Sequence, residues 1–394
     1  MTIQSNVTTE VRYGVESVLG TQSVATGQLL RRTTSSLALA KDAYTSNEVR
    51  PDQQVSDARH GTRRVGGGVA GELSTKTYDD LIEALLRGTW ATGQTITQAA
   101  AGAVVCTAGG AGTGMGTITA TTFITAGFRL GDVFRFTTGP AGNLAKNFRI
   151  IALSQTSMTV SPSPVTVGST ATWSATVQGK KLVTGTTQRS FTFEHRYPDI
   201  SRSEIFLGNR IGDGQFNLPP TGMAMVNFGV QGVNMVSQSG VGFAAPTAAT
   251  NTGILAAVGG SLSAGGAPSA LITGLDISVT NNLSSQPVVG SNTVPEIFYG
   301  RMVVTGNLSA FFQDATILDY FLNETEIALQ AQLDDANATD FLRFLMPRIK
   351  LMGAQKQIGA DGGVILQSPF QALYSSGVSG VDDGTINIQR SNLA

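Results

Sequence analysis

Only two side chains in this 394-residue sequence could act as imidazole bases, His60 and His195. His60 lies in a charged stretch, and His195 stands between Glu194 and Arg196. Acid–base catalysis or metal binding needs several converging partners, yet the sequence contains no HExxH, no GxSxG and no cysteine–histidine pair. We therefore predict ordinary loop and sheet roles for both histidines, with no catalytic, cofactor-binding or metal-binding residue in the chain.

Two glycine-rich runs resemble nucleotide-binding loops in composition only. Gly66, Gly68 and Gly71 satisfy GxGxxG. A dinucleotide site also needs a helix opening at the motif and an acidic residue about 20 positions later, where this chain has Trp90. The run at 109–116 lacks the Lys-Ser/Thr of a phosphate loop. We interpret the first run as a strand with a bulge or close backbone contact, and the second as a turn.

The carboxylate pairs are neighbours in sequence and not partners across a cleft. Adjacent residues on a helix do not face each other, and a general acid–base pair usually comes from separate elements. The pairs are Asp79 with Asp80, Asp334 with Asp335, and Asp382 with Asp383. We interpret them as helix ends and solvated turns.

The composition favours a β-rich structural protein. The chain has 47 glycines, 13% charged residues and a net charge of −1, whereas typical soluble domains are about 25% charged. Proteins that grip nucleic acid by its phosphates show a basic excess, so tight DNA binding is not expected, although DNA could slide past such a surface. The single Cys106 predicts a small buried residue in a protein made for a reducing cytoplasm.

Apolar periodicity predicts short strands and one clear helix in the first half. Residues 36–40 alternate leucines with small residues, as strands do, and the charged stretch 47–64 is predicted to be a solvated loop. A helix is predicted over 77–88, capped by Thr77 and with Asp79 near its positive end. Its apolar stripe consists of Tyr78, Leu81, Ile82 and Leu85.

Short strands separated by turns predict an inserted all-β domain at 92–183. The flanking segments, 36–91 and 184–235, would then form one parent domain. Residues 1–35 are predicted to be an extended N-terminal arm that a neighbouring subunit could hold.

One long segment, 214–275, contains no Asp, Glu, Lys, Arg or His. Its low-complexity part, 236–270, is predicted to be either disordered or packed against another copy of the protein. The missing charge favours packing, since disordered loops are usually polar and charged.

The second half of the chain, 271–394, echoes the first. Five pairs of identical residues share one spacing of 235 positions: Gly71 with Gly306, Leu73 with Leu308, Ser74 with Ser309, Asp79 with Asp314, and Ile82 with Ile317. We also expect 342–353 to take the place of 191–208. An internal duplication is therefore predicted, each copy running strand, loop, strand, helix, strand, strand.

The N-terminal segments 11–22 and 36–90 resemble tail tube proteins of long-tailed, non-contractile bacteriophages, and 127–160 resembles the small β-domain often inserted in them. The resemblance lies in Tyr13, Gly14, Glu16, Gly20, Thr21, Ser46, Asn47, Glu48, Arg50, Asp57, Arg59, Gly61, Gly68, Glu72, Leu73, Tyr78, Asp79, Leu81, Leu85, Gly88 and Trp90.

The resemblance implies a mainly β fold with flanking helices. Two β-sandwich tube domains, one at 36–91 with 184–235 and one at 271–394, would accompany the inserted all-β domain. It also implies a virion protein, assembled in the host cytoplasm, whose stacked rings form the tail tube. Duplication favours rings of three chains with pseudo-sixfold symmetry, and its absence would require six chains.

The expected partners are other copies of the chain, the tape-measure protein, and the tail terminator and distal tail proteins. DNA would pass through the lumen without specific binding, and no membrane is involved. The alternative is a β-rich tail component that binds a receptor or glycan, which would need exposed aromatic residues in a groove. An enzyme on a β-sandwich scaffold is the least favoured reading.

Overall fold

The computed structural model of the chain describes residues 3–24, 26–110, 114–256, 261–268, 272–313, 315–335, 340–359 and 362–392. Strands account for 49% of the structure and helices for 7%. The prediction of a mainly β fold with flanking helices is confirmed.

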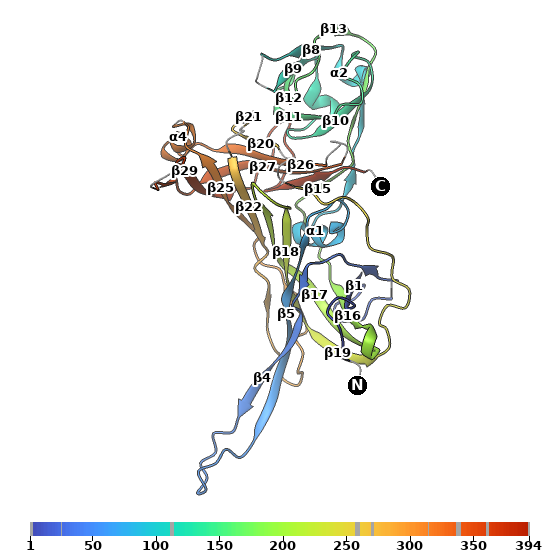
Figure 1. The fold of residues 1–394 in the computed structure, drawn as a ribbon, viewed down its shortest axis with the longest axis vertical. Coiled ribbons are helices and arrows are strands. Elements are labelled where there is room, and N and C mark those ends of the chain that lie inside the picture. The colour runs from blue at the N-terminus through green and yellow to red at the C-terminus, as the bar shows by residue number, and fades with distance from the viewer. Residues whose placement is uncertain are drawn as a thin grey trace.

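A large antiparallel sheet runs through the centre of the molecule (Figure 1). Its successive positions are occupied by β3 and β4 together, then β5, β18, β17, β22, β25, β29 and β27. The bounds are β3 (Thr34–Ser35), β4 (Ala38–Thr45), β5 (Ala58–Glu72), β18 (Met225–Gly232), β17 (Arg202–Leu218), β22 (Ile272–Thr280), β25 (Val303–Phe311), β29 (Ile365–Ala372) and β27 (Phe341–Leu351). A short strand after β27, β28 (Gln355–Gln357), also pairs with β29.

One face of this central sheet is buried and the other is open. In β18, Val226, Phe228 and Val230 are buried whereas Asn227 between them is exposed. Such alternation is expected where one face of an antiparallel sheet packs on a core and the other meets solvent.

β17 and β27 each extend from the central sheet into a second layer. The first half of β17 pairs with β16 and β19, and β1 continues that layer to β2. The first half of β27 pairs with β26 and β30, which lead to β20, β21, β15 and β6. The bounds are β1 (Glu10–Val15), β2 (Gln28–Leu29), β6 (Ala91–Thr92), β15 (Lys180–Val183), β16 (Phe191–Tyr197), β19 (Asn234–Ser239), β20 (Ser261–Ala264), β21 (Ala267–Pro268), β26 (Ile327–Asp334) and β30 (Asn387–Arg390). A 3-10 turn (Pro198–Ile200) joins β16 to β17, and β23 (Ser284–Ser285) pairs with β24 (Ile297–Phe298).

A single hydrophobic core continues beneath both halves of the central sheet. Phe216 of β17 meets Phe344 of β27 with 4.9 Å between ring centroids, which ties the first half of the chain to the second. Two helices accompany the sheet, α1 (Asp79–Leu86) and α4 (Thr316–Leu322).

Helix α1 forms where its apolar stripe predicts it. The stripe residues Tyr78, Leu81, Ile82 and Leu85 are all buried, which confirms the predicted orientation. The predicted cap is wrong, because no side chain caps the helix at its first turn. The Thr77 hydroxyl is instead 2.6 Å from the hydroxyls of both Ser74 and Thr250.

The charged stretch 47–64 corrects another prediction, since only part of it is a loop. Residues 58–64 belong to β5, and Thr45 lies opposite Ala58 in a long hairpin with β4. Figure 1 shows this hairpin projecting far below the rest of the molecule. The strand predicted at 36–40 overlaps the start of β4. Beyond it, both faces of the hairpin are largely exposed, so residues 41–64 carry no apolar alternation from which a strand could be predicted.

The described part of the uncharged segment packs on its own chain. After β19, the backbone N–H of Leu29 donates to the oxygen of Thr247 (2.9 Å), and Leu255 N–H donates to Leu73 oxygen (2.8 Å). Phe243 and Leu255 are buried. The two alternatives drawn from the sequence did not include this arrangement, which fixes residues 240–256. Residues 257–260 and 269–270 lie outside the described residues.

Between β6 and β15, the chain forms a separate eight-stranded sheet with its own core (Figure 1, top). Cys106 is buried there, as predicted. The glycine run at 109–116 is described only in part, because 111–113 lie outside the described residues. The elements are β7 (Thr95–Thr97), α2 (Gln98–Ala101), β8 (Val104–Ala108), β9 (Gly116–Thr119), α3 (Phe123–Ala126), β10 (Val133–Thr138), β11 (Phe148–Leu153), β12 (Ser157–Ser161), β13 (Val167–Thr170) and β14 (Ser174–Val177).

Candidate assembly surfaces

The central sheet ends in two edges. Among the strand pairings of the described residues, β3 and β4 pair only with β5. At the other edge, Lys350 and Leu351 of β27 pair only with β29, as does β28. A bare edge presents unpaired N–H and C=O groups and is a template for another strand. Both edges can therefore accept a further chain.

One row of directly opposed residues crosses the whole sheet from edge to edge. Its members are Thr34, Ala70, Asn227, Gln215, Ser278, Thr305, Gln371 and Lys350. They lie on the open face, because their sequence neighbours Val69, Phe228, Phe216, Ile277 and Val304 are the buried ones. Apart from Lys350, the row carries no charge.

Amide and hydroxyl groups dominate this open face near its centre. Gln215, Asn217 and Asn227 are exposed there, and the Asn217 side-chain amide donates to an Asp276 carboxylate oxygen at 2.5 Å. The face is polar near its centre, where Asp276 adds an exposed carboxylate.

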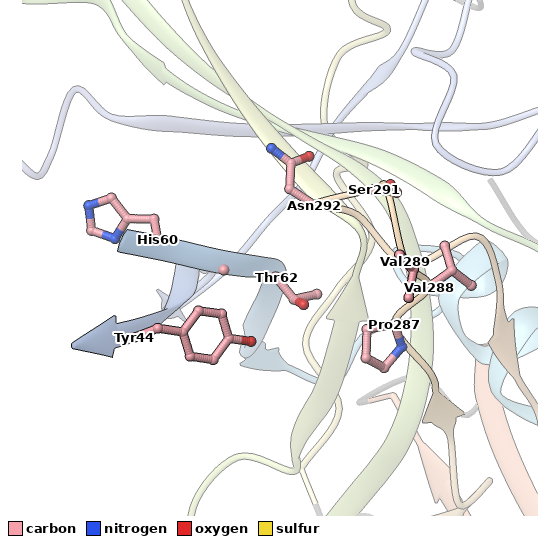
Figure 2. Close-up of a pocket in the computed structure, with 10 residues that line it drawn as sticks. Tyr44, His60, Thr62, Pro287, Val288, Val289, Ser291 and Asn292 are labelled. Atoms are coloured by element: carbon pink, nitrogen blue, oxygen red, sulfur yellow. The ribbon is translucent and has the colours of Figure 1, made fainter. Parts of the chain in front are cut away.

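The β4–β5 hairpin presents a second surface. Val49 near its tip is 96% exposed, and Tyr44 and Val55 are also exposed. An open groove of about 810 Å³ lies where the hairpin meets residues 287–292. Figure 2 shows Tyr44 and His60 on the hairpin side and Pro287, Val288 and Val289 on the other. Backbone contact holds the two sides together, since Arg63 N–H donates to Asn292 oxygen at 2.7 Å.

The two histidines lie on different strands. His60 is exposed on the hairpin, in β5 and not in the predicted loop. His195 is buried in β16, with its Nε2 2.8 Å from the hydroxyl of Ser35. Burial and then the positive charge of Arg32 lower the pKa of His195 to about 4, so its ring is neutral at neutral pH.

The GxGxxG glycines lie within β5, which confirms a strand at this position. A Cβ on Gly71 would come within 1.8 Å of the Tyr78 hydroxyl oxygen, so the close approach predicted there is to a side chain. No three His, Cys, Asp or Glu side chains gather in a possible metal site within the described part of the chain.

Asp79 and Asp80 lie in the first turn of α1, which confirms the predicted helix end, but several of the paired acids make specific contacts instead of being simply solvated. Asp79 accepts a hydrogen bond from Arg390 Nε at 2.9 Å, and Asp80 accepts one from the Tyr13 hydroxyl at 3.0 Å. Burial raises the pKa of Asp79, although Arg390 opposes that shift. Asp382 is 2.8 Å from the ammonium group of Lys181. These carboxylates hold elements together, which sequence spacing did not indicate.

A buried ionic cluster fixes the inserted eight-stranded sheet to the body. Asp132 just before β10 lies 2.8 Å from Lys181 and 4.0 Å from the fully buried guanidinium of Arg343. Gln389 accepts a hydrogen bond from Val133 N–H at 2.9 Å. A buried charge requires such partners, so this junction is a specific contact and not a flexible tether.

An open-edged sheet with a polar face and a projecting hairpin defines a structural protein suited to self-association. The chain matches the family model of the phage tail tube protein over residues 7–372 and belongs to that family. It is a structural component of a bacteriophage tail, and the resemblance seen in its sequence is confirmed. No protein with a curated description matches the chain. Within the described ranges, no helix is long and apolar enough to cross a membrane.

Proposed function

We propose that three copies of this chain close into a ring, and that stacked rings form the tail tube. The main support is the order of strands in the central sheet. β3/β4, β5, β18 and β17 make one set of four, and β22, β25, β29 and β27 make a second set in the same antiparallel order. The pairing of β17 with β22 joins them. Each chain would thus supply two equivalent sectors, the predicted domain at 36–91 with 184–235, extended by β3 at 34–35, and the predicted domain at 271–394.

The predicted duplication supports this reading at the level of side chains. Gly71 of β5 and Gly306 of β25 occupy matching places, and at both a Cβ would come within 2.5 Å of a neighbouring atom, of Tyr78 in the first case and of Asp276 and Phe370 in the second. Leu73 and Leu308 are both buried beside them. Asp314 lies outside the described residues.

The strand pairings favour one change to the sequence-based alignment. β27 pairs with β29 as β17 pairs with β18, so 342–353 corresponds to the second half of β17. In the alignment from strand pairings, β26 occupies the place of β16. The alignment from sequence had given that place to 342–353.

The open face of the central sheet would line the lumen. Its amide and hydroxyl groups are wettable yet offer no concentrated positive charge, so the tape-measure protein and DNA could pass without being held. The opposite face is already committed to the core. The inserted domain at 92–183 would then lie on the outside, and the tail terminator and distal tail proteins would bind the ends of the tube.

Ring closure also explains why bare edges are tolerated. An unpaired edge is an aggregation hazard, and a closed barrel removes it. Head-to-tail contact around an axis closes a ring, while the same kind of contact along the axis builds a filament. Such a role needs no catalysis, and we assign none.

Electron microscopy of the purified protein tests the proposal. We expect rings or tubes whose averaged cross-section has threefold symmetry with six similar inner lobes. Six copies per ring would overturn the stoichiometry and leave the tube role intact. A protein that stays monomeric at high concentration, in sedimentation as well as in images, would overturn the tube role itself.

A further inference from the structure

We propose that the ring is joined through one defined register, in which Lys350 of one copy lies opposite Thr34 of the next. This inference rests on the proposed ring and adds the strands and residues that meet between copies. The occupant of each open edge is therefore the opposite edge of a second copy of this chain.

The first argument combines the row across the sheet with the repeat in the sequence. Ala70 and Thr305 lie in the same row, and they are separated by the same 235 positions as the five repeated residue pairs. The row of opposed residues and the 235-position repeat therefore give the same superposition of the two halves. In that superposition Thr34 corresponds to Ser278, and Gln215 corresponds to Lys350.

The second argument is that the chain already contains one such joint. Gln215 of β17 lies directly opposite Ser278 of β22 within the chain. Because Lys350 corresponds to Gln215 and Thr34 to Ser278, the equivalent joint between copies places Lys350 opposite Thr34. β27 would run antiparallel to β3, as β17 runs antiparallel to β22.

The backbone of β27 has the orientation that this joint needs. The N–H of Leu373 donates to Arg348 oxygen (2.8 Å), and the N–H of Met352 donates to Pro369 oxygen (2.7 Å). Residues 348 and 352 thus face β29, and alternation along a strand turns Leu351 toward the open edge. Ile349 still pairs with Ile327 of β26, so the free edge begins at Lys350.

The backbone of β3 has the matching orientation. Ser36 N–H donates to Gly68 oxygen at 2.9 Å, so residues 34 and 36 face β5 and Ser35 faces outward. Thr33 is an exception on this edge, because its N–H also bonds Ala70 oxygen. Lys350 and Thr34 would then form a non-hydrogen-bonded pair, whose Cα atoms are about 4.5 Å apart in antiparallel sheets.

The internal joint has the same alternation. There, Asn281 N–H donates to Gly212 oxygen at 2.8 Å, which turns residues 212, 214 and 216 toward β22. Gln215 and Ser278 therefore form a non-hydrogen-bonded pair within the chain, as proposed for Lys350 and Thr34 between copies.

The surroundings of β3 leave room for a neighbouring strand. A hollow of about 350 Å³ lies along this edge, and its lining includes Arg32, Thr33, Thr34 and Ser35 together with Val11 and Tyr197. Thr33 and Thr34 are exposed, as is Met352 after β27.

Disulfide trapping tests this register, because a pair about 4.5 Å apart lies within the Cα separations that disulfides span. The variant Thr34→Cys/Lys350→Cys, oxidised after assembly, should give covalent dimers and trimers on non-reducing gels, with nothing beyond the trimer. Cys106 is buried and serves as the unreactive background. The internal control Gln215→Cys/Ser278→Cys should oxidise within one chain and give no ladder.

The register control is Ser36→Cys/Lys350→Cys, which is displaced by two residues and should stay uncrosslinked. Should the double variant fail to assemble, a mixture of Thr34→Cys chains and Lys350→Cys chains replaces it, and should give dimers only. Tubes that form without the Thr34–Lys350 crosslink, or that crosslink through Ser36, would overturn the register and leave the proposed function standing. Absence of any ring or tube in the unmodified protein would instead overturn the proposed function.

Discussion

Gln215 of β17 and Ser278 of β22 lie directly opposite each other, and their pairing makes one sheet of the two halves of the chain. Beneath this joint, Phe216 packs against Phe344 of the second half at 4.9 Å. The halves are therefore held by backbone pairing on one level and by a shared core on another. A ring built from such chains would have rigid joints inside each copy and weaker ones between copies.

The joint within the chain should depend strongly on its buried aromatic contact. Phe216 is 1% exposed, so Phe216→Ala should lower the free energy of unfolding by about 3–5 kcal/mol through cavity formation. Chemical denaturation followed by circular dichroism measures this loss. The neighbouring exposed residue provides the control, since Asn217→Ala should cost less than about 1 kcal/mol. Equal losses for the two variants would contradict the shared core.

Gly71 should tolerate no side chain, whereas Gly66 on the same strand should. A Cβ on Gly71 would come within 1.8 Å of the Tyr78 hydroxyl oxygen, but one on Gly66 would have no atom within 4 Å. Gly71→Ala should therefore cost about 1–3 kcal/mol by overpacking, and Gly66→Ala should be close to neutral. Thermal unfolding compares them. Adding Tyr78→Phe to Gly71→Ala should recover part of the loss, and its failure to do so would refute the clash.

Stability should fall in mild acid because of His195. Its pKa is about 4 in the folded protein and 6.5 as a free side chain, so the folded state disfavours the protonated ring. The contribution of the neutral His195 ring to the free energy of unfolding is complete above pH 6.5. As the pH falls toward 4, up to about 3 kcal/mol of that free energy is lost. Denaturation curves at several pH values should show this slope, and His195→Gln should flatten it. The matched control is His60→Gln, at an exposed position, which should leave the slope unchanged. If the stability of His195→Gln still falls steeply with pH, His195 is not the cause of the slope.

The uncharged segment should contribute to contact between copies through its exposed side. Val236 is 44% exposed, so Val236→Asp should block polymerisation while leaving the circular dichroism spectrum unchanged. Val165 of the inserted domain is 46% exposed, and Val165→Asp should still polymerise. Met235 is unsuitable for this test because it packs against the main core. If the Val236→Asp variant forms normal tubes, this segment is not part of the interface between copies.

The inserted domain should be dispensable for assembly. Its chain enters and leaves side by side, since Val177 N–H donates to Gln94 oxygen at 2.9 Å, so a short linker can replace 95–177. Deletion removes Asp132, and Arg343→Gln should accompany it because a buried cation that loses its neighbouring carboxylate is costly. Electron microscopy should show thinner but intact tubes. Loss of all assembly by a folded deletion variant would mean that the domain is not peripheral.

Local patterns in the sequence determined the elements and the faces that they bury. The stripe of α1 and the alternation at 36–40 are readable because side-chain direction follows the 3.6- and 2-residue periods of helices and strands. The 235-position repeat is readable as identical residues at one spacing. The resemblance to tail tube proteins was readable because its residues follow one another in a set order within segments 11–22 and 36–90.

Tertiary structure alone decided which strands meet and in what register. β17 and β22 are distant in sequence, and a slip of one residue would reverse every side chain in the pairing, so bulges and core contacts choose the register. The burial of His195 and the pairing of Asp79 with Arg390 likewise depend on elements far apart in the chain. The projecting part of the β4–β5 hairpin, including residues 58–64, was missed because backbone pairing holds it together and its exposed side chains leave no pattern of burial in the sequence.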